Sequence, residues 1–102
     1  MTADASRAVT HVALRGELDA VGAPEAERAL AAALRDPEVS SVVVHLDEVE
    51  FIDSCGLRAL VAAADAAERR GVELRMLPGR LEVMSVVEAA SLAGRLPFVG
   101  WP

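Results

Sequence analysis

The residues best placed to do chemistry lie in one short stretch, Phe51-Ile52-Asp53-Ser54-Cys55-Gly56, between a valine-rich segment and a segment of helical periodicity. Asp and Ser are common helix N-cap residues, because their side-chain oxygen accepts a hydrogen bond from an otherwise unpaired backbone N–H. The same position suits a phosphate, since free N–H groups and the helix dipole attract an anion. Either Asp53 or Ser54 could therefore be the N-cap of the helix, and Ser54 could be both a structural cap and a modifiable hydroxyl.

The other reactive side chains form no catalytic or metal-binding pattern. Cys55 is the single cysteine, so it has no disulfide partner, and no second thiol or general base supports a redox or nucleophilic role. His11 and His45 each lie within a strand pattern and have no Cys or His partner at ligand spacing. We therefore expect no metal, no cofactor, no catalytic residue and no enzymatic activity.

The composition argues against a nucleic-acid-binding, membrane-spanning or secreted protein. The 102 residues carry a net charge of -6 and include no lysine, so nucleic acid is a poor partner. No apolar run approaches the roughly 20 residues needed to cross a bilayer, and the N-terminus lacks the apolar core of a signal peptide. Together with the single cysteine, these features predict one cytoplasmic domain that spans residues 1–102.

Strand and helix patterns alternate along the chain. After a loose lead-in over residues 1–8, the periodicity predicts strands at 9–15, 42–46 and 72–77, with a short edge strand at 96–99. It predicts helices at 24–35, at about 56–70, and from Pro78-Gly79 to a close at Gly94. Pro24 suits a first helical turn, and Gly71 suits a left-handed cap. The predicted fold is α/β, a mixed sheet of about four strands with helices packed against it.

Two motifs resemble one protein family. The segment Phe51 to Leu57, between a valine-rich strand and an apolar helix, resembles the phosphorylation motif of STAS-domain anti-sigma factor antagonists, the anti-anti-sigma factors of bacteria. Gly16-Glu17-Leu18-Asp19 resembles their second signature, which the family places on the same face. The likeness continues through Gly71-Val72-Glu73-Leu74 and the helix after Pro78, so it covers nearly the whole chain.

The resemblance implies roles for individual residues. Ser54 would be the phosphoacceptor, Asp53 would help to orient its hydroxyl, and Asp19 would border the partner surface. Gly56 would let the backbone of a partner approach. Cys55, which stands where the family usually has Ser or Thr, and Leu57 would complete the partner-binding set.

The function implied by the resemblance is transcription regulation by partner switching. The unphosphorylated protein would bind an anti-sigma factor that is also a serine kinase of the histidine-kinase-like ATPase fold, and so release the sigma factor. Phosphorylation at Ser54 would switch this binding off, and a metal-dependent serine phosphatase would restore it.

Two alternatives keep a similar architecture. A non-switching STAS subunit, either a lipid-transporter accessory or a stress-sensing scaffold, would use the same surface only for binding. A phospho-aspartate receiver could use Asp47 after its strand, but receivers need an acidic pair and a lysine near the acceptor. The sequence has no lysine, so we set the receiver aside.

Overall fold

The computed structural model describes residues 8–101, in which strands and helices alternate strictly. The strands are β1 (Ala8–Leu18), β2 (Val39–Ile52) and β3 (Glu73–Leu77), and the helices are α1 (Ala23–Arg35), α2 (Ser54–Arg70) and α3 (Leu81–Ala89). The predicted lead-in lies outside the described residues except for Ala8, which already belongs to β1. The predicted α/β class is confirmed.

Within residues 8–101 the sheet has three strands, which roughly matches the predicted sheet of about four. Its order is β1-β2-β3, and both strand pairs are parallel. The predicted edge strand at 96–99 forms only an isolated parallel bridge between Met76 and Phe98. Pro97 accepts a bond from Met76 N–H at 2.9 Å but has no N–H of its own to donate, so the ladder does not extend.

Strand β2 is much longer than its valine run indicated. Ala13 pairs with His45 but Arg15 pairs with Glu48, so β2 carries an extra residue at this irregularity. Val44 and Leu46 are buried two residues apart, as regular alternation requires, but the next buried residue is Val49, three positions further on. Because the regular alternation stops at Leu46, the sequence pattern indicated too short a strand.

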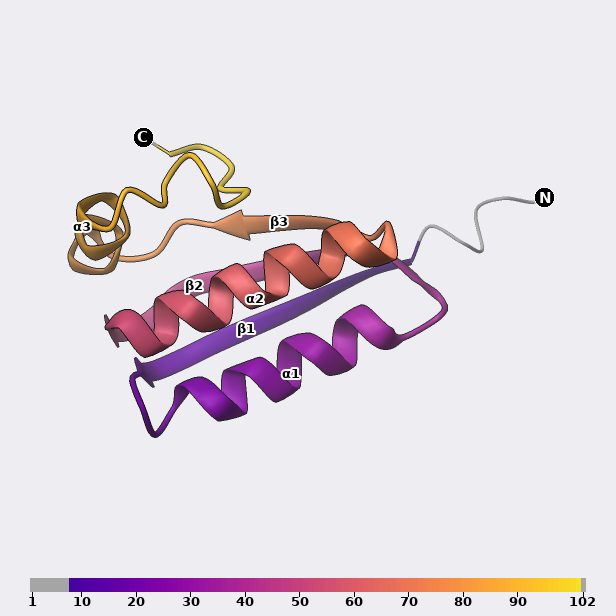
Figure 1. Ribbon diagram of the computed structural model, residues 1–102, viewed down its shortest axis with the longest axis horizontal. Helices are drawn as coiled ribbons and strands as arrows, with labels where there is room; N and C mark the ends of the chain where they lie inside the picture. The colour runs from indigo at the N-terminus through magenta and orange to yellow at the C-terminus, as the bar shows by residue number, and fades with distance from the viewer. Residues whose placement is uncertain (1–7, 102) are drawn as a thin grey trace.

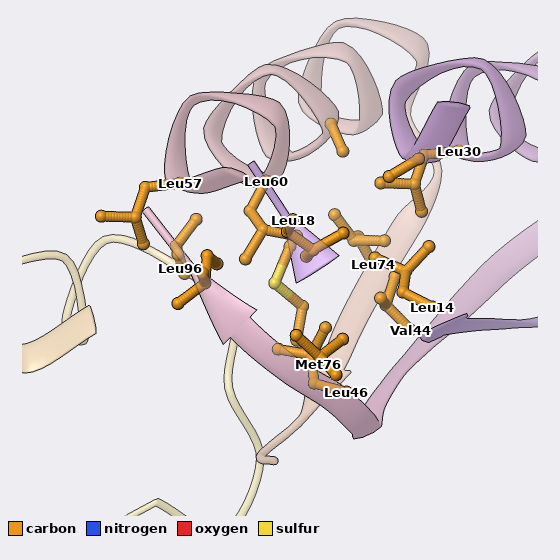
Figure 2. Close-up of a cluster of buried hydrophobic side chains, with 14 of the residues drawn as sticks. Leu14, Leu18, Leu30, Val44, Leu46, Leu57, Leu60, Leu74, Met76 and Leu96 are labelled. Carbon is orange, nitrogen blue, oxygen red and sulfur yellow. The ribbon is translucent and has the colours of Figure 1, made fainter. Parts of the chain in front are cut away.

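Helices α1 and α2 lie side by side over one face of the sheet, and α3 lies beyond the carboxyl end of β3 (Figure 1). The core fills the space between the helices and the sheet, where leucines of α2 meet β2 and β3 (Figure 2). Its largest fully buried side chains are Leu30, Leu46, Leu60, Met76, Met84, Val42, Val44, Val49, Val83 and Val87. On the other face of the sheet, alternate residues of β1 such as His11, Ala13 and Arg15 are exposed.

Three of the residues predicted to start or end a helix lie at helix boundaries in the structure. Pro24 lies in the first turn of α1, which ends at Arg35 before Asp36-Pro37. Gly71 ends α2 in the left-handed region, at φ 70°. No helix within residues 8–101 is both long enough and apolar enough to span a membrane.

Candidate functional site

The two sequence motifs meet at the carboxyl edge of the sheet. Leu18 and Ile52 are register partners at the ends of parallel strands, so the residues that follow them adjoin. The backbone N–H of Asp53 donates to the Leu18 carbonyl oxygen at 3.2 Å, which ties the two loops together directly. Asp19 and Asp53 are therefore held in neighbouring loops at one edge of the sheet.

Asp53, not Ser54, is the N-cap of α2. Its Oδ1 accepts hydrogen bonds from the backbone N–H groups of Cys55 at 2.9 Å and Gly56 at 3.3 Å. These two donors have no partner within the helix, so the carboxylate satisfies them and also complements the positive end of the helix dipole. The carboxylate thus positions the start of α2, and with it Ser54.

Ser54 is the first residue of α2 and is exposed. Within the part of the chain that the structure describes, its hydroxyl makes no hydrogen bond. The structure shows no hydrogen bond between this hydroxyl and the Asp53 carboxylate, whose Oδ1 accepts from the backbone N–H groups of Cys55 and Gly56. What remains is a free hydroxyl at a helix N-terminus, accessible to another molecule.

Asp19 fixes the loop that lies beside this hydroxyl. Its Oδ1 accepts from Gly22 N–H at 2.9 Å and from Val21 N–H at 3.0 Å. The hydrogen bond from Gly22, and then that from Val21, hold the pKa of the Asp19 carboxyl below its ordinary value of 3.8. Near neutral pH this loop therefore presents a fixed negative charge.

Gly56 and Leu57 belong to the packing of the fold. Gly56 is buried, and a Cβ there would overlap the Leu18 carbonyl oxygen. The close approach that Gly56 permits is thus to β1 of the same chain, which corrects the expected approach by a partner backbone. Leu57 is 7% exposed and faces the core (Figure 2). Of the six predicted site residues, only Ser54 is exposed, while Asp19, Asp53 and Cys55 are partly buried.

Sequence reasoning missed two neighbours of the site. Arg58 follows Ser54 by four residues on α2 and is exposed, so it lies on the same helix face one turn further on. That spacing was already visible in the sequence. Val21 is 86% exposed in the loop held by Asp19, and only the fold reveals that this apolar side chain is left uncovered.

The site offers a surface for binding and one hydroxyl for modification. Within residues 8–101, no three His, Cys, Asp or Glu side chains converge where they could together hold a metal ion. Cys55 is a free, partly buried thiol beside Ser54. The described groups at this edge are thus one exposed hydroxyl, two partly buried carboxylates and one partly buried thiol.

The STAS domain family model matches residues 1–99, and the chain therefore belongs to the STAS domain family. No curated protein sequence matches the chain.

Solved structures of related fold include two antagonists and one transporter domain. An anti-sigma factor antagonist from Mycobacterium paratuberculosis is 26% identical, with a TM-score of 0.78 over 91% of this chain and 78% of that one. The anti-sigma factor antagonist SpoIIAA, in its unphosphorylated form, is 19% identical, with a TM-score of 0.71 over 88% and 77%. The STAS domain of a SulP transporter from Vibrio cholerae is 17% identical, with a TM-score of 0.67 over 88% and 71%. The last two likenesses establish the fold alone.

Proposed function

We propose that this protein is an anti-sigma factor antagonist that switches partners through phosphorylation of Ser54. The observation that carries the proposal is the exposed Ser54 hydroxyl at the start of α2, beside the loop held by Asp19, in a STAS domain. The 26% identical antagonist from Mycobacterium paratuberculosis supports the same class of partner.

The proposed switch acts through charge. Phosphorylation replaces the neutral hydroxyl by a group of charge about -1.5 to -2. The edge already carries the Asp19 and Asp53 carboxylates, and Arg58 supplies a single positive charge one turn away on α2. Burying such a group in an interface without a basic partner costs several kcal/mol, and each 1.4 kcal/mol or so weakens binding about tenfold.

The switch requires no rearrangement of the fold. The Leu18–Asp53 hydrogen bond and the Asp53 cap hold both loops without using the Ser54 hydroxyl, so the proposed modification removes neither donor nor acceptor from them. In the proposed cycle, the unphosphorylated form binds an anti-sigma factor that is also a serine kinase of the histidine-kinase-like ATPase fold, and the sigma factor is released. A serine phosphatase returns the modified protein to the binding form.

The test is incubation with the candidate anti-sigma kinase and ATP, followed by mapping of the phosphate and a binding assay of both forms. We expect phosphate on Ser54 and binding weakened about tenfold or more in the phosphorylated form. Ser54→Ala should bind but not be phosphorylated, and Ser54→Asp should bind more weakly. Ser85→Ala, which changes an exposed serine of α3, should behave like the unchanged protein.

Two results would contradict the proposal. Phosphate at a residue other than Ser54 would refute the assigned acceptor. Equal affinity of the phosphorylated and unphosphorylated forms would refute switching, and would favour the alternative of a non-switching STAS interaction subunit.

A further inference from the structure

Two histidines that are 34 residues apart in the chain lie in direct contact on the sheet. His11 Nδ1 and His45 Nε2 are 2.8 Å apart, and the ring centroids are separated by 5.1 Å. Neither residue has a Cys or His partner at ligand spacing along the chain, so this contact arises only from the pairing of β1 with β2.

The strand register places both rings on the face of the sheet away from α1 and α2. His11 pairs with Val43 and Ala13 pairs with His45, so the histidines are diagonal neighbours, within reach of long side chains. His11 is exposed and His45 is half-buried. Among the described residues, the second nitrogen of each ring makes no hydrogen bond. Within residues 8–101, the two imidazoles are therefore hydrogen-bonded only to each other.

We propose that His11 and His45 form a binding site for a zinc ion, with water in the remaining coordination positions. Neutral imidazole is a common zinc ligand, and two ring nitrogens already face one another. With Zn–N bonds of about 2.0–2.1 Å and bond angles of about 90–110°, the two nitrogens would stand about 2.8–3.4 Å apart. From their present contact of 2.8 Å, the rings would separate by a few tenths of an ångström and turn so that both nitrogen lone pairs point at the ion.

The proton between the rings does not block the site. In the hydrogen-bonded pair, one ring donates N–H and the other accepts through its lone pair. The donor ring can move its proton to its second nitrogen, which faces water, so both facing nitrogens become ligands without a change in net protonation. Zinc then replaces the shared hydrogen.

Arg15 and Arg75 are each paired with a glutamate, so their positive charges are partly compensated and repel a bound cation less. Arg15 Nε lies 3.3 Å from Glu48 Oε1, so this guanidinium on β1 is already paired. Arg75 on β3 is likewise paired with Glu73 through its Nη2, at 2.6 Å. The net charge of -6 gives the whole chain a potential that attracts cations.

This site is separate from the proposed switch. His45 precedes Ile52 by seven residues of β2, which corresponds to about 20 Å along a strand, and Ser54 lies beyond that end. Zinc binding and partner switching can therefore succeed or fail independently.

The test is calorimetric titration of the full chain with zinc chloride near neutral pH. We expect one ion per chain, with affinity about tenfold or more weaker in His11→Gln and in His45→Gln, and no binding in the double variant. Val9→Thr changes an exposed side chain on the same strand and keeps both imidazoles, so it should bind as the unchanged chain does. Circular dichroism checks that each variant is folded.

A second measurement uses the unchanged protein. Nitrogen NMR of the histidine side chains should show both rings shifting together with the same zinc dependence as the calorimetric titration. Absence of zinc uptake, undiminished uptake by the double variant, or loss of uptake in Cys55→Ser with both imidazoles present would each overturn the assignment.

Discussion

Gly56 lies directly against Leu18, so that the start of α2 touches the end of β1 without an intervening side chain. A Cβ at position 56 would overlap the Leu18 carbonyl oxygen and lie 2.7 Å from both Leu18 Cβ and Ile52 Cγ1. This contact holds the start of α2 against the end of β1, from which the loop that begins at Asp19 continues. The relative position of the two motifs therefore depends on the missing side chain at Gly56.

The first prediction concerns this contact. Gly56→Ala should lower the free energy of unfolding by about 1–3 kcal/mol, because the clashing neighbours include backbone atoms that have little freedom to move. Urea denaturation measures the change. Gly94→Ala is the matched control, since a Cβ there meets no atom within 4 Å, and its stability should stay close to that of the unchanged chain. Equal stability of both variants would contradict the packing role of Gly56.

The second prediction concerns the cap of α2. Asp53→Ala removes the acceptor of two backbone N–H groups and should cost about 1 kcal/mol, whereas Asp53→Asn should retain most of the stability, because an amide oxygen also caps. Denaturation of both variants separates capping from charge. Asp65→Ala, at an exposed position within α2, should have little effect. A loss as large in Asp53→Asn as in Asp53→Ala would show that charge, not capping, matters.

The third prediction concerns pH and Asp19. Because the folded chain lowers the pKa of this carboxyl, its contribution to stability is present in full above the ordinary value of 3.8 and is lost as the pH falls through the lower folded value. The stability of the unchanged protein relative to Asp19→Asn should therefore decrease as the pH falls below about 3.8. Urea midpoints measured from neutral to acid pH test this. A constant difference between the two proteins would exclude the lowered pKa.

The fourth prediction separates the proposed switch from the stability of the fold. Ser54→Ala and Ser54→Asp should each change the free energy of unfolding by no more than about 0.5 kcal/mol, because the side chain is exposed. For Ser54→Asp, attraction to the helix N-terminus opposes repulsion from Asp53. Thermal unfolding of both variants checks this. A large loss in Ser54→Asp would mean that weaker partner binding reflects unfolding instead of charge.

Local signals in the sequence determined the order of elements and the place of the candidate site. Pro24, Gly71 and the change of period after the valine run depend on neighbouring residues, so the α/β alternation and the start of α2 near Ser54 were predictable. The motif likeness identified the STAS family, which the family match confirms. The roles of the predicted site residues remain predictions.

Only the tertiary structure decided which distant residues meet. The irregular pairing near His45 extends β2 to Ile52, and the sheet register then brings Asp53 to Leu18 and His45 to His11. The tertiary structure also shows that Gly56, which we expected to contact a partner, lies against β1 of the same chain. Local periodicity indicates which face a residue occupies but carries no information on strand register. Pairs across strands are fixed by the packing of the whole sheet and its helices.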